Sequence, residues 1–393
     1  MATAIRQVEL SAPWPAFDGL DTYRRCMLVL RWHGRIVGRA FVPLNRGRLA
    51  PEEVERHARD ALGPDALQAW TESALGFDER DPPGTRRPTA TVAICTRERP
   101  EDLVRTLAGV VALEPRPVEI LVVDNAPATP RAREVVAGVP GVRYVVEPVR
   151  GLNNARNRAM REASGDVVAF TDDDAVPEPE WLDGLLQNFG DPRVLCVTGL
   201  TLPSELETPA QELFEEHCPF ARGFRRRVFN GRIDNPLAVS RVGAGANMAL
   251  RRRAIDLVGP FDGRLDAGTA TRSGGDHEMF TRILLAGYRI IYEPRAVSWH
   301  RHRRTQEELV DVVRGYGTGV YAMWSGLLIE RREFGVLRLA WQWFRYDHLP
   351  ILRRPSRLRA GEGRDALRRA ELRGCVAGPR AWLSSRRSTT THA

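Results

Sequence analysis

The feature that most constrains the fold is an alternation of short apolar runs with amphipathic segments, which begins at Thr89. Buried strands are expected at residues 90–95, 119–124, 142–146 and 167–171, with helices between them at 100–112, 131–136 and 153–163. Asn153 or Asn154 is expected to cap the third helix. Repeated strand–helix–strand units favour a mainly parallel sheet with helices on both faces. The sequence therefore predicts a Rossmann-like α/β domain.

Polar residues follow three of these strands at the point where each is expected to end. They are Thr96-Arg97-Glu98, Asp124-Asn125 and the run from Asp172 to Asp174. In open α/β sheets, ligands bind at the carboxyl ends of strands. An extended backbone would point Asp172 and Asp174 the same way, so that they share one divalent cation, with Asp173 turned aside. A solvated acidic turn or a helix cap is the alternative reading of this run.

The second half of the domain has a less regular pattern. We expect a helix at residues 181–189, a strand at 194–199, irregular chain at 204–235, and a glycine-opened loop that enters a strand at 242–250. A further helix is expected from Asp276 to Gly287, followed by a last core strand at 288–292. The domain is expected to span residues 86–304.

Two flanking regions complete the predicted organisation. Residues 1–85 are expected to form a small accessory α+β module, with a hairpin at 26–42, a helix from Pro51 and a linker at 81–88. Residues 305–393 are expected to form a helical extension that ends in a loose basic tail from about Pro355. Its mixture of aromatic residues and arginine could lie on an anionic membrane surface, or could pack against the main domain.

Composition excludes several classes of function. All 58 basic residues are arginine, so Schiff-base, pyridoxal and standard P-loop chemistry have no lysine to use. The net charge is +8, yet no recognition helix or zinc-finger spacing is present, so a nucleic-acid partner is not expected. The five cysteines are scattered, and we find no signal peptide or membrane-spanning stretch. These features predict a cytoplasmic protein.

Seven short motifs occur in an order and spacing that resemble the family 2 nucleotide-sugar glycosyltransferases. They are Thr96-Arg-Glu-Arg-Pro, Val122-Val-Asp-Asn, Gly151-Leu-Asn-Asn-Ala-Arg-Asn, Phe170-Thr-Asp-Asp-Asp, Gly243-Ala-Gly-Ala-Asn, Gly274-Gly-Asp-His-Glu and Trp299-His. Three adjacent aspartates are common by chance, whereas seven motifs in order are specific. The resemblance covers about residues 89–304 and implies a GT-A fold.

The resemblance assigns the donor-side roles. It implies that Asp172, Asp174 and His300 lie at a Mn²⁺ or Mg²⁺ ion, with Asp173 in support. The nucleotide sugar would be bound by these residues of the first half: Thr96, Arg97, Glu98, Asp124, Arg156 and Asp173. A turn or cap aspartate remains the alternative for Asp124, a surface ion pair for Arg156, and a structural role for His300.

The resemblance also assigns a catalytic base and an acceptor side. Asp276 would remove the proton of the acceptor hydroxyl, as an inverting transfer requires. Similar proteins usually have Gly-Glu-Asp where this chain has Gly274-Gly275-Asp276, which leaves Glu278 as a second candidate and an ordinary N-cap as the alternative. Acceptor contacts are expected from Gly245, Asn247, Glu278 and Trp299. A β-bulge is the competing account of the glycine loop.

Together these observations predict a metal-dependent, inverting hexosyltransferase that moves a sugar from a nucleoside diphosphate to a hydroxyl acceptor. The acceptor could be a glycan, a lipid-linked sugar at the inner membrane face or a small molecule. One rival is a sugar-phosphate nucleotidyltransferase, but the first strand lacks the usual glycine- and lysine-rich signature. The other rival is a non-catalytic carbohydrate-binding or scaffold protein with this fold.

Overall fold

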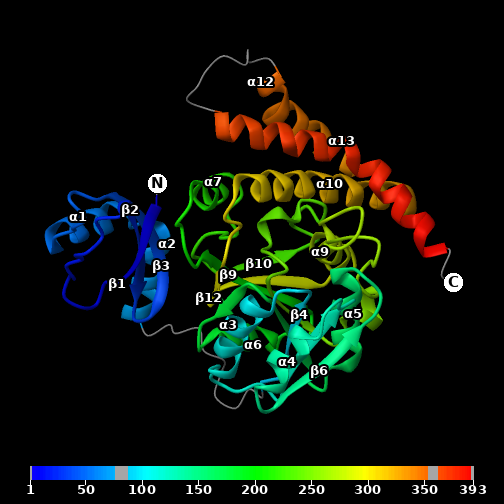
Figure 1. Ribbon diagram of the computed structural model, residues 1–393, viewed down its shortest axis with the longest axis horizontal. Coiled ribbons are helices and arrows are strands. Elements are labelled where there is room, and N and C mark those ends of the chain that lie inside the picture. The colour runs from blue at the N-terminus through cyan, green and yellow to red at the C-terminus, as the bar shows by residue number, and fades with distance from the viewer. Residues whose placement is uncertain (1, 76–86, 353–361, 391–393) are drawn as a thin grey trace.

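The computed structural model describes residues 2–75, 87–352 and 362–390 (Figure 1). Its centre is a nine-stranded sheet in the order β10-β12-β9-β11-β7-β4-β5-β6, with β8 paired to β12. The strands are β4 (Ala90–Thr96), β5 (Glu119–Asn125), β6 (Val142–Glu147), β7 (Val167–Asp172), β8 (Ala175–Pro177), β9 (Val194–Pro203), β10 (Arg227–Asn230), β11 (Asn247–Arg251) and β12 (Arg289–His300). The α/β class expected from the sequence is confirmed.

The four strands that come first in the chain, β4 to β7, form the parallel half of this sheet. Strands β7, β4, β5 and β6 are neighbours, and each pairs in parallel with the next. In register, Thr96 lies opposite Asp124, and Cys95 lies opposite Asp172. The residues that follow β4, β5 and β7 therefore meet at one edge of the sheet, as the alternating pattern predicted.

The other half of the sheet is mixed. Strand β11 runs antiparallel to both β7 and β9, β12 runs parallel to β9, and β8 and β10 run antiparallel to β12. A parallel sheet thus describes the part built by residues 90–172, whereas the later strands reach their places through loops and short helices. The last core strand is also longer than expected, because β12 continues from Arg289 to His300.

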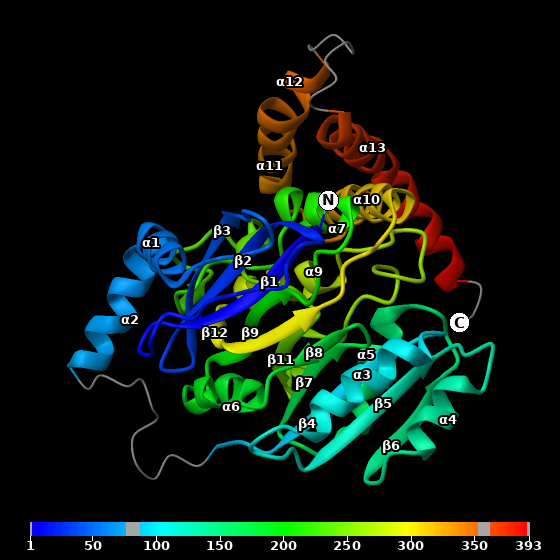
Figure 2. The same cartoon turned by 60° about the vertical axis from the view of Figure 1, so that its left-hand side comes forward.

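Helices cover both faces of the sheet (Figure 2). They are α3 (Pro100–Val111), α4 (Arg131–Ala137), α5 (Leu152–Glu162), α6 (Trp181–Leu186), η1 (Gln187–Gly190), α7 (Pro209–His217), η2 (Val239–Arg241), α8 (Ala254–Val258) and α9 (Gly275–Leu285). One core packs α3, α4 and α6 against alternate strand residues such as Val92 and Ile94. The other packs α5 and α9 against the opposite face, where Ala93 and Phe170 point.

Two local predictions are wrong. The N-cap of α5 is Gly151, with φ of 134°, so Asn153 and Asn154 lie inside the first turn. The stretch expected to be irregular contains α7, whose Thr208 cap accepts a hydrogen bond from Gln211 in a capping box. In both cases the helix begins at a capping position that apolar periodicity alone does not locate.

The N-terminal module contains a three-stranded sheet and two helices: β1 (Ala2–Glu9), β2 (Tyr23–Trp32), β3 (Arg35–Pro43), α1 (Pro51–Ala61) and α2 (Pro64–Ala74). The predicted hairpin is β2–β3, and β1 adds a parallel strand. Thr3 bridges to Leu206, and Arg39 pairs with Glu215 of α7, so the module contacts the main domain. Most of the expected linker lies outside the described residues.

The C-terminal extension contains α10 (Gln306–Arg331), α11 (Gly335–Trp343), the π-helical turn η3 (Phe344–His348), α12 (Leu349–Leu352) and α13 (Glu362–Thr390). A loose tail is wrong for residues 362–390, since α13 lies along α10. Glycines permit this contact, because a Cβ at Gly374 would lie 2.1 Å from the carbonyl oxygen of Arg314. Among the described residues, we find no helix with the length and apolarity needed to cross a bilayer.

Candidate active site

The three aspartates after β7 do not alternate as an extended strand would. Strand β7 ends at Asp172, and the chain turns at Asp173 and Asp174 before β8 begins. Asp173 is buried, and its carboxylate accepts a hydrogen bond of 2.8 Å from Thr96 and one of 3.1 Å from Arg99. Burial, reinforced by the charge of Asp174, raises the pKa of Asp173 to about 7. Asp173 and Thr96 therefore tie β7 to β4.

Asp174 is held among cationic and imidazole groups. Its carboxylate lies 3.2 Å from His300 Nε2, 2.9 Å from Arg99 Nη1 and 3.3 Å from Arg303 Nη2. Burial would raise the pKa of Asp174, but these neighbours together hold it well below its usual range. Asp174 is therefore ionised at neutral pH, at the carboxyl edge of the sheet.

A chain of hydrogen bonds orients His300. Its Nδ1 lies 3.0 Å from Nδ1 of His302, and His302 Nε2 lies 3.2 Å from Glu215, which pairs with Arg39. Burial would raise the pKa of Glu215, but His302 and Arg39 lower it overall. An ionised Glu215 accepts from His302 Nε2, so a neutral His302 accepts the Nδ1 proton of His300. The same chain of contacts directs His300 Nε2 toward the Asp174 carboxylate, 3.2 Å away.

These side chains fit a hard divalent cation only in part. Among the residues described, no three His, Cys, Asp or Glu side chains are grouped closely enough to hold a metal by themselves. The expected set of Asp172, Asp174 and His300 is therefore not assembled as three ligands. Mg²⁺, however, is commonly held by one or two carboxylates, with substrate phosphates and water as the remaining ligands. Asp174 and His300, with half-buried Asp172 next to the turn, fit that smaller donor set.

Asp124 is a buried carboxylate with one unused oxygen. Its Oδ2 accepts a hydrogen bond of 2.7 Å from the Tyr144 hydroxyl, whereas buried Oδ1 has no partner in the described residues. Arg97 Nε, in the adjacent loop, is also buried without a partner there. Burial raises the pKa of Asp124. An acceptor and a donor left unpaired beside each other match a ligand that carries both types of group, as a nucleoside does.

Glu98 and Asn125 connect the loops that surround this site. Glu98 has φ of 55°, and it accepts from the backbone N–H groups of Ala128 and Thr129. Asn125, which the sequence analysis left without a role, donates to the carbonyl of Val149 and accepts from the N–H of Gly151. The loops after β4, β5 and β6 are thereby fastened to one another.

Arg156 lies in the first half of α5 and is almost fully buried. Its Nη1 lies 2.7 Å from Asp266 and 3.2 Å from the side-chain oxygen of Asn153. Burial would lower the pKa of Arg156, but the charges of Asp266, Asp172 and Asp276 outweigh it and raise the pKa. Arg156 is therefore a buried cation, not a surface ion pair, and three carboxylates act on it.

Asp276 occupies the first turn of α9, after the left-handed cap residue Gly274. Its two oxygens accept hydrogen bonds of 2.8 Å from the backbone N–H groups of Gly245 and His277. Burial would raise the pKa of Asp276, but His277, Arg156 and these N–H groups lower it overall. Asp276 is not the N-cap, and its carboxylate is ionised and able to take up a proton.

The surroundings of Gly275 explain why this chain has glycine where similar proteins have the glutamate of Gly-Glu-Asp. A Cβ at this position would lie 2.2 Å from Asn153 Nδ2 and 2.6 Å from Asp266 Oδ2. The carboxylate of Asp266 therefore occupies the space beside Asp276 that a side chain at 275 would need. Gly245 is restricted in the same way, because its Cβ would lie 2.7 Å from Arg156 Nη2. The glycine loop thus allows Arg156 and Asp276 to approach each other.

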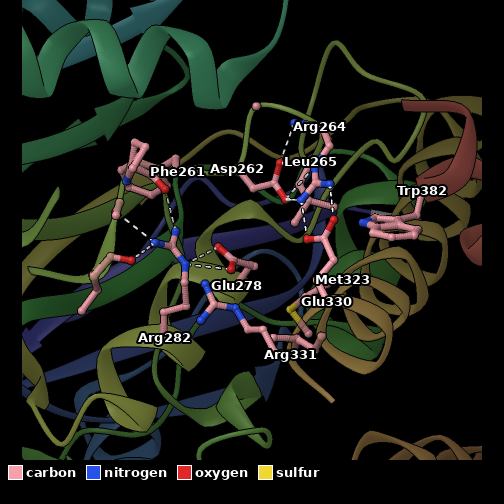
Figure 3. Close-up of a pocket in the computed structure, with 16 residues that line it drawn as sticks. Phe261, Asp262, Arg264, Leu265, Glu278, Arg282, Met323, Glu330, Arg331 and Trp382 are labelled. Atoms are coloured by element: carbon pink, nitrogen blue, oxygen red, sulfur yellow. Dashed lines mark hydrogen bonds and ion pairs between the residues drawn. The ribbon is translucent and has the colours of Figure 1, made fainter. Parts of the chain in front are cut away.

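Glu278 does not share the surroundings of Asp276. Two residues along a helix turn the side-chain direction by about 200°. Glu278 forms a two-oxygen ion pair with Arg282, at 2.7 and 2.9 Å, on the wall of a cavity of about 360 Å³ (Figure 3). That cavity lies between α9, the loop before it and the helices α10 and α13, where Trp382 closes one side.

Two other expected acceptor contacts are also used within the fold. Asn247 is fully buried; it donates to the carbonyls of Leu200 and Ala296 and accepts from Trp181. Trp299 donates to Glu178, which pairs with Arg31 of the N-terminal module. The structure does not bring either side chain to Asp276, so both hold elements together.

Four ionisable residues of the site were not predicted from the sequence: Arg99, Asp266, His302 and Arg303. Arg99 directly follows Glu98, and His302 stands two residues after His300, so proximity to a predicted residue was a usable signal. Asp266 lies in a loop without regular structure, and nothing in its sequence neighbourhood points to Arg156.

Comparisons with known proteins agree with this geometry. The sequence profile of Glycosyl transferase family 2 matches residues 91–258. The chain is 29% identical over 285 residues to a pre-mycofactocin glycosyltransferase of Mycobacterium tuberculosis, covering 70% of this chain and 56% of that protein. It is also 29% identical over 217 residues to succinoglycan biosynthesis protein ExoM of Rhizobium meliloti, covering 52% and 64%. It thus spans less than two thirds of the length of these relatives.

A solved structure, the mannosyltransferase PcManGT from Pyrobaculum calidifontis in complex with GDP-Man and Mn²⁺, aligns with 83% of this chain and 81% of its own. The TM-score is 0.46 and the sequence identity 18%. Independently of that alignment, the sheet covered by helices on both faces agrees with the GT-A fold that the motifs implied. The chain is thus similar to the family 2 glycosyltransferases, and the matched domain spans residues 91–258.

Proposed function

We propose that this chain is a metal-dependent, inverting glycosyltransferase of the hexosyltransferase type, which uses a nucleoside diphosphate sugar and a hydroxyl acceptor. The observation that carries the proposal is the environment of Arg156. Its guanidinium pairs with Asp266, and the charges of Asp172 at the end of β7 and of Asp276 at the start of α9 also raise its pKa. One aspartate expected on the donor side and the expected base thus act on the same buried cation.

The donor would bind along the carboxyl ends of β4, β5 and β7. The unpaired Oδ1 of Asp124 and Nε of Arg97 are suited to the nucleoside, and Arg156 supports negative charge farther along the edge. Asp174 and His300 would hold Mn²⁺ or Mg²⁺, with Asp172 beside them. When bound, the cation would stabilise the negative charge of the diphosphate.

The transfer would be a single displacement. The acceptor oxygen forms a bond to the anomeric carbon while the bond from that carbon to the diphosphate oxygen breaks, which inverts the anomeric configuration. Asp276 takes the hydroxyl proton, and the N–H groups of Gly245 and His277 hold its carboxylate in place. Asp266 keeps Arg156 charged and oriented beside it.

The test is turnover of UDP-, GDP- and dTDP-sugars with Mn²⁺ and after metal removal. Diphosphate release that requires the metal is expected. Asp174→Ala should reduce kcat/KM about 1,000-fold, because it removes charge that acts in the transition state. Asp18→Asn, at an exposed pair with Arg48, is the matched control and should leave the rate unchanged. Nucleotide-sugar binding without turnover by the wild type would favour the scaffold protein and overturn the proposal.

A further inference from the structure

One side of α11 exposes large apolar side chains to solvent. Phe334, Leu337 and Trp341 are 67, 55 and 62% exposed, and Tyr346 in the following turn is 72% exposed. We call these four residues the aromatic stripe. The first three are spaced by three and four residues, which places them along one side of the helix. Exposed apolar side chains in a contiguous row usually mark an interaction site.

The other side of the same segment is packed into the protein. Val336 is buried in a cluster with Leu327 and Trp382, the Trp343 ring lies 5.9 Å from that of Trp324, and His348 is fully buried. The segment therefore has one face that the fold uses and one face that it leaves to solvent. Core packing, the expected alternative for these aromatic residues, accounts for the first face only.

The aromatic stripe lies among arginines. Arg338 and Arg345 are exposed and share its side of the helix by spacing, and the Arg345 guanidinium lies 5.8 Å from the Tyr346 ring centre. The sequence from 331 to 359 contains eight arginines and two acidic residues. A second copy of this chain would bring a like charge to the stripe, whereas an anionic surface would be attracted.

The aromatic stripe is connected to the candidate active site by α10. The N-terminal end of α9 packs closely on this helix, since a Cβ at Gly274 would lie 2.8 Å from the carbonyl oxygen of Gly319, and Ser273 donates to the carbonyl of Gly315. Helix α11 follows α10 directly. In both views α11 and α12 extend away from β4, β5 and β6 (Figures 1 and 2). The helix that carries the stripe thus lies beyond α10, away from the strands of the donor half.

We infer that the aromatic stripe docks on a bilayer surface that contains anionic lipid. Phe334, Leu337 and Trp341 would enter the headgroup region, with Arg338 and Arg345 against lipid phosphates. The proposed function supplies only the reason for docking: contact on the α9 side would bring Asp276 near acceptors carried by a membrane.

Sedimentation with vesicles tests the inference on the full chain. Wild type should bind vesicles of phosphatidylcholine with 30% phosphatidylglycerol, and bind pure phosphatidylcholine at least tenfold more weakly. The triple variant Phe334→Ser/Leu337→Ser/Trp341→Ser should lose at least tenfold in affinity for the anionic vesicles. Arg338→Glu/Arg345→Glu should lose at least fivefold at low salt, and this difference should shrink in high salt.

Helix α2 supplies the matched control. Its Leu67 and Trp70 are 64 and 52% exposed, but they stand near Asp65 and Glu72. Leu67→Ser/Trp70→Ser should therefore leave vesicle binding unchanged. Thermal unfolding of each variant verifies folding, and the arginine variant removes no apolar surface, so it serves if the triple variant is unstable.

Three results would overturn the inference. They are failure of wild type to sediment with anionic vesicles, unchanged binding by both stripe variants, and a solution dimer that the triple variant converts to monomer. The last would identify a second copy as the occupant. Without vesicles, the variants of the stripe and of the two arginines should turn over sugar nucleotide at the wild-type rate. If the wild type itself shows no turnover, the proposed function is contradicted, but the vesicle-binding result still stands.

Discussion

The motif residues of the two halves of the sheet differ in their hydrogen bonding. In the donor half, formed by β4, β5 and β7, Asp124 Oδ1 and Arg97 Nε are buried without partners in the described structure. In the acceptor half, formed by β9, β11, β12 and α9, Asn247 makes three hydrogen bonds within the fold, and Glu278 is paired through both oxygens. The motif residues Asp124 and Arg97 therefore have unpaired atoms in one half, whereas Asn247 and Glu278 are paired within the fold in the other.

This difference in hydrogen bonding shows that a motif residue can have either of two roles, binding a ligand or holding the fold. An unpaired buried polar atom costs stability, about 1–3 kcal/mol, and a ligand that completes the hydrogen bond is one reason for it to persist. A residue whose hydrogen bonds are all made within the fold has no free group for the substrate, but it holds the backbone that positions other side chains. Gly245 shows the link, because its N–H holds Asp276 while the neighbouring Asn247 anchors β11. Under the proposed function, Asp276 is therefore the side chain of the acceptor half that takes part in the chemistry.

The largest effect expected from this contrast is on stability. Asn247→Ala should lower the free energy of unfolding by about 3 kcal/mol, because it leaves two carbonyls and the Trp181 N–H unpaired in the core. Chemical denaturation measures this change, and Asn45→Ala at an exposed position is the control. The KM for the donor should stay within a factor of two. If the Asn247→Ala variant is as stable as wild type but has a raised KM for the acceptor, Asn247 binds the acceptor and the structural role is contradicted.

In the donor half the expected effect falls on binding. Asp124→Asn should weaken nucleoside diphosphate binding about tenfold, because a charged acceptor is replaced by an amide that must also satisfy Tyr144. The unfolding free energy should change little, because the amide oxygen can still accept the Tyr144 hydrogen bond and no ion pair is lost. Calorimetric titration with UDP, GDP and dTDP measures the affinity. Equal affinity of wild type and variant for all three would remove Asp124 from the nucleotide site.

The smallest effect is expected at Trp299. Trp299→Phe removes one hydrogen bond to Glu178 and should cost about 1 kcal/mol of stability. The turnover number should remain that of wild type, since the ring is directed to the N-terminal module. A tenfold fall in kcat for this variant, with unchanged stability, would contradict the division between the two halves.

The donor half could be predicted from the sequence because its information is local. A buried strand followed by a polar residue fixes where Asp124 and Asp172 lie, and parallel pairing then brings the strand ends together. The expectation of an extended backbone through Asp174 was wrong for a local reason: β7 ends at Asp172, and the chain turns at Asp173 and Asp174.

The rest of the site depends on contacts between distant segments. Asp266 reaches Arg156 across 110 positions, and His302 reaches Glu215 across 87, through loops whose paths no periodic pattern defines. From the sequence, Gly275 indicated that the acidic neighbour of Asp276 was missing. In the structure, the Asp266 carboxylate, from another loop, occupies that space. The side-chain ties of Asn247 and Trp299 were likewise invisible, since they are set by the packing of β9, β12 and α6.

The most direct test of the account separates binding from chemistry at Asp276. Asp276→Asn keeps the shape of the side chain but removes the base, so it should bind nucleoside diphosphate sugar and Mn²⁺ with wild-type affinity in a calorimetric titration. Its sugar transfer, measured on the same preparation, should fall by at least about 100-fold. Wild-type turnover by Asp276→Asn would contradict the assignment of Asp276 as the base and, with it, the claim that the two halves meet at one catalytic site.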